Sequence, residues 1–353
     1  MFRLRRGLYI STLYLLLLLM HSSTSYGRIL ITNGKESQQK ARNTRTVRVE
    51  EGYVTTDDGV RLFYQRAGRG GRTIIIPGRL FVFDDLKQLA DRYTVISYDM
   101  RNRGRSSAVS DGSRITIQDD IKDLEKVRQH FRVKKFVAVG YSYLGMMVVL
   151  YTMEHPQFVE KIVQFGPVPL KFGTRYPAHL TTGDEGTGAD PAEIEKVRRL
   201  EEQGYAKTNP KEFCEAQWAV DRYGLVGNPA NVWKLGKGWC EMPNEWPVNF
   251  ERHIQYHFAS VQKLNVSWEK VAKVTQPVLT VHGTKDRNAP YGAGREWALR
   301  LPNARLLTIR DAAHQSFAEY PEIIINALRA FLGGRWPDGA EKVTEIDNQK
   351  ISK

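Results

Sequence analysis

Short apolar runs alternate with longer segments of helical period along most of the chain. The runs are rich in β-branched residues, which is typical of strands buried on both faces of a sheet. Strands are predicted at residues 73–76, 94–98, 136–139, 159–165, 276–281 and 304–309. Helices are predicted at residues 83–93, 115–131, 144–153, 292–301 and 315–332. This alternation predicts an α/β fold with a mostly parallel central sheet, flanked by helices and built with right-handed crossovers.

The alternating pattern is preceded by a predicted antiparallel hairpin. Its strands are expected at residues 46–55 and 60–67. The dipeptide Asp58-Gly59 between them is a strong turn signal, because it favours the tight turns that connect hairpin strands.

Residues 168–273 interrupt the alternation of strands and helices. Asp190-Pro191 and Asn209-Pro210 each place a capping residue before a proline at the first helical position, and Asn228-Pro229 predicts a third helix start. A fourth helix is predicted at residues 253–264. We interpret this segment as a helical cap inserted between two strands of the sheet.

These patterns divide the chain into consecutive parts. They are a signal peptide (1–25), a flexible spacer (26–48), the first part of the α/β core (49–167), the cap (168–273), the second part of the core (274–333) and a polar tail (334–353).

The N-terminus has the pattern of a secretory signal peptide. Arg3, Arg5 and Arg6 precede an apolar run at residues 8–20, and small polar residues follow as far as Ser25. We expect cleavage after Ser25 and a secreted or periplasmic protein, with no stable membrane insertion once the signal is removed. The alternative is an uncleaved signal anchor that holds the chain at the membrane.

The composition is basic, with 52 Lys and Arg against 39 Asp and Glu and a net charge of +13. Such a charge can favour nucleic acid, but here the basic residues are scattered along the chain and form no dense tract. We therefore expect a solvated basic surface and no nucleic-acid partner. The oligomeric state cannot be inferred from the sequence.

A serine lies in a turn between a predicted strand and a predicted helix. Residues 136–139 form the strand, Gly140 to Ser142 the turn and residues 144–153 the helix. This layout is that of a nucleophile elbow, which lifts a serine hydroxyl out of the sheet above a helix N-terminus. Leu144 stands where the G-x-S-x-G pattern has its second glycine, and Gly145 follows one position late.

Four further motifs follow in a fixed order around this elbow, and with them the chain resembles the α/β-hydrolase family. They are TIIIPG at 73–78, DMRNRGRS at 99–106, VHGTKD at 281–286 and DAAH at 311–314. They are similar to the family's oxyanion-loop strand, its D-x-R-G-x-G-x-S turn, its acid-bearing strand end and its histidine loop. The cap and the second motif resemble the proline iminopeptidase and carboxylesterase branch.

The resemblance implies a catalytic triad of Ser142, Asp286 and His314, in the nucleophile–acid–base order of this fold. Such a triad activates a serine hydroxyl, because the histidine accepts its proton and the acid orients the histidine. Asp311 is a weaker candidate for the acid, since it lies close in sequence to His314. The resemblance also implies an oxyanion hole formed by backbone N–H groups. We assign these groups to Tyr143 and to Arg79 or Leu80.

The predicted function is hydrolysis of a small ester or amide through an acyl-enzyme, with no cofactor and no metal site. One branch of the resemblance implies an aminopeptidase similar to proline iminopeptidase, in which cap carboxylates hold the substrate's amino group. Another implies a carboxylesterase acting on small esters. A third possibility is a catalytically silent binding module of the same fold. The cap carboxylates that could hold the amino group are Glu212, Glu215, Asp221, Glu241 and Glu245. The candidates chosen for substrate contacts are Glu212, Glu215, Glu241 and Trp218.

The serine at position 142 and the two cysteines narrow the predicted reaction class and predict a cross-link. A serine at position 142 excludes epoxide hydrolases and dehalogenases, which need a carboxylate nucleophile. Cys214 and Cys240 are the only cysteines, and in an exported chain such a pair is a disulfide candidate. The alternative is two separate buried thiols.

Overall fold

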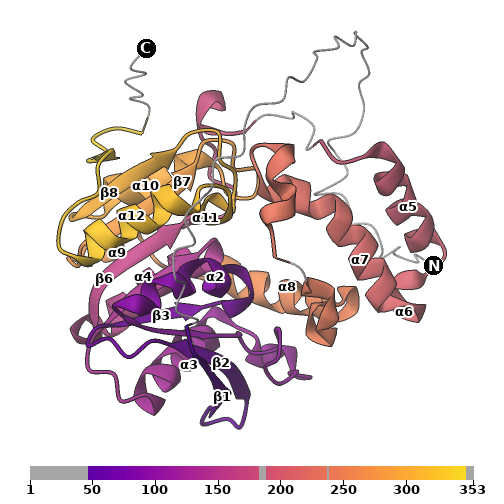
Figure 1. Cartoon of the computed structure of the whole chain (residues 1–353), viewed down its shortest axis with the longest axis horizontal. Coiled ribbons are helices and arrows are strands. Elements are labelled where there is room, and N and C mark those ends of the chain that lie inside the picture. The colour runs from indigo at the N-terminus through magenta and orange to yellow at the C-terminus, as the bar shows by residue number, and fades with distance from the viewer. Residues whose placement is uncertain (1–46, 183–187, 237, 347–353) are drawn as a thin grey trace, which may run out of the picture. The chain divides into compact units, whose positions relative to one another are not determined.

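The computed structural model describes residues 47–182, 188–236 and 238–346 (Figure 1). The predicted signal peptide and nearly all of the predicted spacer lie outside these residues. None of the helices in the described ranges combines the length and the apolar character needed to cross a bilayer.

A mostly parallel sheet forms the centre of the described chain, as the sequence predicts (Figure 1). Strands β3 to β8 pair in parallel, in the order β4-β3-β5-β6-β7-β8, while β1, β2 and β9 pair antiparallel at the two edges. The strands are β1 (Val49–Thr55), β2 (Arg61–Ala67), β3 (Thr73–Pro77), β4 (Thr94–Tyr98), β5 (Phe136–Tyr141), β6 (Val159–Phe165), β7 (Val278–Gly283), β8 (Ala304–Ile309) and β9 (Ala340–Glu341).

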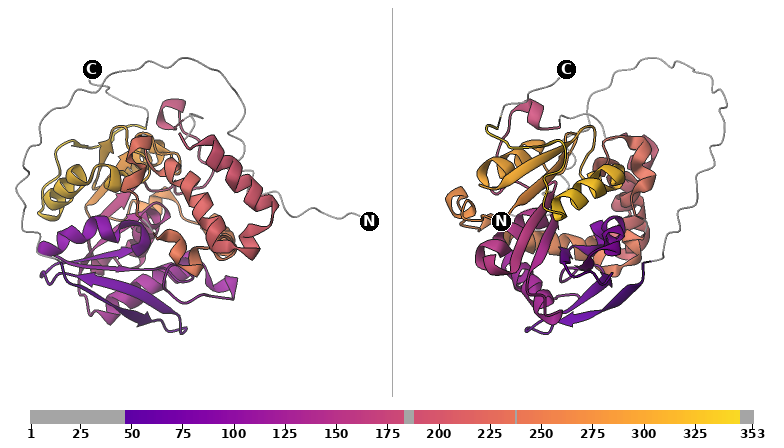
Figure 2. Two further views of the ribbon diagram at one scale, coloured as in Figure 1. Left: turned by 45° about the vertical axis from the view of Figure 1, so that its right-hand side comes forward. Right: turned by 60° about the vertical axis from the view of Figure 1, so that its left-hand side comes forward.

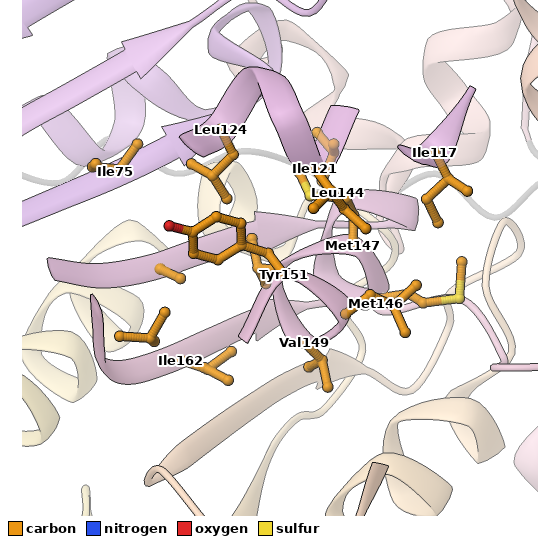
Figure 3. Packing of buried hydrophobic residues seen from close by; sticks show 14 of the residues in the cluster. Ile75, Ile117, Ile121, Leu124, Leu144, Met146, Met147, Val149, Tyr151 and Ile162 are labelled. Carbon is orange, nitrogen blue, oxygen red and sulfur yellow. The ribbon is translucent and has the colours of Figure 1, made fainter. Parts of the chain in front are cut away.

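Helices cover both faces of the sheet, and each face has its own core. On one face α3 (Ile117–His130) and α4 (Tyr143–Glu154) pack over strand residues such as Ile75 (Figure 3). On the other, α2 (Arg79–Leu86) and α12 (Pro321–Leu332) pack over neighbouring residues such as Ile74. Successive side chains of a strand point to opposite faces, which is why these central strands are apolar throughout.

The segment between β6 and β7 is mainly helical and forms the cap (Figures 1 and 2). The helix predicted at Asn228-Pro229 is only a short 3-10 helix, Pro229–Lys234, and glycines follow it at 236 and 238. The α-helices of the segment are α5 (Pro191–Glu202), α6 (Tyr205–Thr208), α7 (Pro210–Asp221), α8 (Pro247–Gln262) and α9 (Trp268–Val271).

Three local features differ from the sequence prediction. Helix α2 begins at Arg79, directly after the oxyanion-loop glycine, and ends at Leu86. The predicted closing helix is divided into α11 (Ser316–Glu319) and α12, because Pro321 has no N–H group to continue the hydrogen bonding of α11. The predicted tail contains β9, a two-residue strand too short to give a periodic signal.

Candidate active site

Ser142 lies at the tip of a sharp turn between β5 and α4. Its backbone has φ 58° and ψ −127°, a conformation that costs free energy in a non-glycine residue. The Ser142 N–H donates to Phe165 O at 2.8 Å, which ties the turn to the end of β6. A Cβ atom at Gly140 would lie 2.1 Å from Leu144 O, so the turn requires glycine there.

Leu144 is accommodated because its buried side chain packs against Gly78, which follows β3 and has no Cβ atom. Its side chain is 3% exposed, and its Cδ1 lies 2.5 Å from where a Cβ atom of Gly78 would be. The close helix–strand approach falls instead at Gly145, where a Cβ atom would lie 3.2 Å from Pro167 Cβ. The glycine displaced by one position therefore still allows α4 to pack closely on the sheet.

Asp286 and His314 form a buried hydrogen-bonded pair. His314 Nδ1 lies 2.7 Å from Asp286 Oδ2, and Asp286 Oδ1 accepts from the N–H groups of Asn288 and Ala289, both at 2.9 Å. Burial alone would raise the pKa of Asp286. The charge of His314 and hydrogen bonds from His282 and His314 outweigh burial and hold that pKa well below its usual range. Asp286 is therefore an ionised acceptor suited to orient an imidazole.

The Ser142 turn and the Asp286–His314 pair lie at the same edge of the sheet. The rings of Tyr141 and His314 are 4.6 Å apart between centroids, so the residue before Ser142 contacts the histidine. Gly166 follows Phe165, whose carbonyl holds Ser142, and a Cβ atom there would lie 2.9 Å from Asp286 Oδ2 and 3.1 Å from His314 Nδ1. The three residues of the predicted triad are thus gathered where β5, β6, β7 and β8 end.

The other acid considered from the sequence, Asp311, faces elsewhere. Its side chain is 70% exposed and pairs with Lys285 at 3.2 Å.

A second histidine, His282, to which sequence reasoning assigned no role, also contacts the acid. His282 Nε2 lies 3.1 Å from Asp286 Oδ2 and 3.0 Å from Ala289 O, and the side chain is fully buried. The available signal was its place near the end of β7, four residues before Asp286.

The expected oxyanion donors lie at two helix N-termini. Tyr143 is the first residue of α4, and Arg79 and Leu80 are the first two of α2, so their N–H groups have no acceptor within their own helices. The contact of Leu144 with Gly78 brings the two helix starts together. The Arg79 side chain itself is held by Asp99, through bonds of 2.9 and 3.0 Å.

The three cap glutamates proposed from the sequence face solvent. Glu212 is exposed, and the side chains of Glu215 and Glu241 are 56% and 64% exposed and pair with Lys211. Residue type alone does not reveal this exposure, because it depends on how the cap helices pack. The structure does not bring them to the triad, so we do not propose them further as substrate contacts.

Another of the cap carboxylates considered from the sequence, Glu245, is buried between cap and core. It is 2% exposed and contacts Arg103 Nε and Nη2, the shortest distance being 2.6 Å. It also accepts from Gly104 N at 2.7 Å. No sequence signal distinguishes Glu245 from the exposed glutamates, because the contact joins residues far apart in the chain.

Trp218 belongs to an aromatic series that ends at the histidine. Its ring stacks on Trp239 at 5.5 Å with an interplanar angle of 4°. Trp239 contacts Phe81 at 5.2 Å, Phe81 contacts Tyr141 at 5.5 Å, and Tyr141 contacts His314. The inner side of the cap therefore presents aromatic surface toward the triad.

The two cysteines form a disulfide, Cys214–Cys240, with Cα atoms 5.7 Å apart. The bridge joins α7 to the segment that carries Trp239 and Glu245. Among the described residues, no three His, Cys, Asp or Glu side chains are grouped so as to hold a metal ion.

Comparison with known proteins finds hydrolases that are similar to this chain. A bifunctional esterase/perhydrolase of Acinetobacter calcoaceticus is 27% identical over 292 residues, covering 80% of this chain and 99% of that protein. A proline iminopeptidase of Lactobacillus helveticus is 23% identical over 263 residues, covering 71% of this chain and 83% of that protein.

Solved structures share the fold at lower identity. An esterase from Exiguobacterium antarcticum has a TM-score of 0.59 at 17% identity, covering 80% of this chain and 98% of that one. A 2-hydroxy-6-oxo-6-phenylhexa-2,4-dienoate hydrolase from Rhodococcus has a TM-score of 0.62 at 17% identity, covering 82% and 100%. The family model described as alpha/beta hydrolase fold matches residues 82–321. The chain therefore belongs to the alpha/beta hydrolase fold family.

Proposed function

We propose that the protein is a serine hydrolase that forms an acyl-enzyme on Ser142. The observation that carries this proposal is the buried Asp286–His314 hydrogen bond of 2.7 Å beside the strained Ser142 turn. Strained backbone is retained at functional sites when the surrounding structure fixes it. Esterase and peptidase relatives support hydrolysis as the reaction class.

The residues suit two successive acyl transfers. His314 Nε2 accepts the proton of the Ser142 hydroxyl while its oxygen attacks the substrate carbonyl carbon. The carbonyl oxygen becomes an oxyanion that the N–H groups of Tyr143 and of Arg79 or Leu80 stabilise. The intermediate collapses, the bond to the leaving group breaks, and His314 returns the proton to that group. Water then attacks the acyl-enzyme by the same route and releases the acid and free Ser142.

The proposed substrate is a small ester with an apolar or ring-bearing acyl group. The aromatic series from Trp218 to Tyr141 supplies apolar surface near His314. Glu245, the buried carboxylate that the cap brings to the core, is already bonded to Arg103 and to Gly104 N. It is therefore not available to bind a free amino group.

An aminopeptidase is the second candidate. It is supported by the likeness to a proline iminopeptidase and by the resemblance of the turn at residues 99–106 to that branch of the family. In either case the cap sets selectivity, since the triad attacks whichever acyl carbonyl is presented to it.

Substrate preference can be measured by comparing a proline arylamide with short-chain and long-chain aryl esters. We expect kcat/KM to be highest for the short or ring-bearing esters, with little amide cleavage. Preferential cleavage of the proline amide would make the protein an aminopeptidase and contradict the ester proposal. The triad mechanism would stand in both cases, because both reactions need Ser142.

Export is proposed from the sequence pattern alone. We expect the secreted chain to begin after Ser25, since the basic start, the apolar run and the small-residue exit fit signal cleavage. N-terminal sequencing of protein recovered outside the producing cell tests this. A chain that stays with the membrane and still begins at Met1 would indicate an uncleaved anchor instead.

A further inference from the structure

Three parts of the molecule meet at one buried carboxylate, Asp120, which bonds the residue that follows the proposed nucleophile. The Tyr143 hydroxyl donates to Asp120 Oδ2 at 2.7 Å, and His257 Nε2 lies 3.2 Å from the same oxygen. Tyr143 begins α4, Asp120 lies on α3 and His257 on the cap helix α8 (Figure 1). Asp120 and His257 are 3% and 4% exposed, so this contact is shielded from water.

The rings around this carboxylate are fixed in orientation. The His257 ring meets the Tyr143 ring nearly perpendicularly, at 4.0 Å and 84°, and stacks on His253 from the other side at 5.4 Å and 8°. An imidazole N–H can donate to a carboxylate oxygen, so this contact has the partners of a hydrogen bond between α8 and α3. The Ser260 hydroxyl donates to His257 O and accepts from Ile117 N, which also ties α8 to the start of α3.

Tyr143 is partly buried, and it differs from the other tyrosines because its backbone N–H is the proposed oxyanion donor. The peptide that carries this N–H also joins Tyr143 to Ser142, whose backbone is already strained. Holding the Tyr143 side chain restricts rotation of that peptide. The direction of the Tyr143 N–H then depends on Asp120 and on the position of α8. A small misalignment of this N–H with the oxyanion lowers kcat.

We propose that Asp120 is a positioning residue that couples the seating of the cap, through His257, to the oxyanion donor at Tyr143. This inference rests on the proposed serine hydrolase function and adds to it a link between the cap and the chemical step. A substrate that shifts α8 would then change the direction of the Tyr143 N–H. The cap would not need to contact the reacting carbonyl.

The chain contains a matched control for this inference. The Tyr151 hydroxyl donates to Glu125 Oε2, also at 2.7 Å, and these residues lie on the same two helices, α4 and α3. Tyr151 packs within the core between the helices and the sheet (Figure 3). It lies eight residues after Tyr143 on α4. Tyr143→Phe and Tyr151→Phe therefore remove the same kind of bond between the same helices, but only the first removes it from the residue next to Ser142.

The test measures kcat and KM of both variants on a short aryl ester, normalised to correctly folded protein. We expect Tyr143→Phe to lower kcat by about 10-fold with KM within about twofold, because the loss falls on transition-state stabilisation. Tyr151→Phe should keep the wild-type kcat. His257→Gln should lower kcat as Tyr143→Phe does, and the double variant should lose less than the product of the two single losses.

Equal kcat values for Tyr143→Phe and Tyr151→Phe would overturn the inference, as would fully independent effects of Tyr143→Phe and His257→Gln. If Tyr143→Phe does not fold, Asp120→Asn provides the same comparison, since it keeps the side-chain shape and weakens both contacts. Failure of the proposed function is distinguishable, because Ser142→Ala would then keep full activity. Failure of this inference alone would leave Ser142→Ala inactive.

Discussion

Replacing Ser142 or His314 by alanine is expected to remove nearly all hydrolysis. Loss of the nucleophile or base of such a triad lowers kcat by about 10⁵-fold or more, because the two act as a unit. Asp286→Asn is expected to cost about 10⁴-fold, since an amide no longer holds the imidazole in the required tautomer. Steady-state kinetics on an aryl ester, with circular dichroism to verify folding, measures these effects.

Asp311→Asn is the control for Asp286→Asn. Asp311 is exposed and pairs with Lys285, so this change should leave kcat near the wild-type value. Wild-type turnover in Ser142→Ala would contradict the mechanism. A large loss of kcat in Asp311→Asn with none in Asp286→Asn would show that Asp311, and not Asp286, is the acid of the triad.

Replacing Glu245 by alanine is expected to have the largest effect on stability. Arg103 is 6% exposed and its guanidinium lies against the rings of Phe81, Trp239 and Phe250, at 5.7, 5.4 and 4.8 Å. Without Glu245 this buried charge and the Gly104 N–H lose their acceptor. Removing one partner of a buried ion pair costs about 3–5 kcal/mol. Chemical denaturation with the disulfide intact measures the loss.

Glu241→Ala is the matched control for this prediction. Glu241 lies four residues earlier in the same cap segment and pairs with Lys211 in solvent, so its loss should change stability little. Replacing Arg103 and Glu245 together by Met and Leu should recover much of the stability lost in Glu245→Ala, because apolar packing can substitute for a buried pair. An equal effect of Glu245→Ala and Glu241→Ala would contradict the structure at this contact.

The order of the sheet elements could be predicted because its signals are local. Each central strand is a short apolar run whose alternate residues belong to opposite cores. Ile75 lies in one core and Ile74 in the other. The motifs follow strand ends, so fold rules alone bring Ser142, Asp286 and His314 to one edge. These residues could therefore be proposed without any tertiary information.

The cap contacts could not be predicted, because they depend on tertiary packing. Glu241 and Glu245 lie in neighbouring 3-10 turns, yet one is exposed and the other buried against Arg103. Short turns have no long period that would reveal which side faces the core. The role of Asp120 was missed for the same reason, since its partners Tyr143 and His257 come from other helices.

Labelling with a fluorophosphonate, followed by peptide mapping, tests the central proposal most directly. The probe reacts only with an activated serine, and it reports the nucleophile whatever the natural substrate is. We expect one phosphonylated site, at Ser142, with no label in Ser142→Ala and very slow labelling in His314→Ala. An unlabelled wild-type protein, or a label on another serine with Ser142 unmodified, would contradict the proposed mechanism.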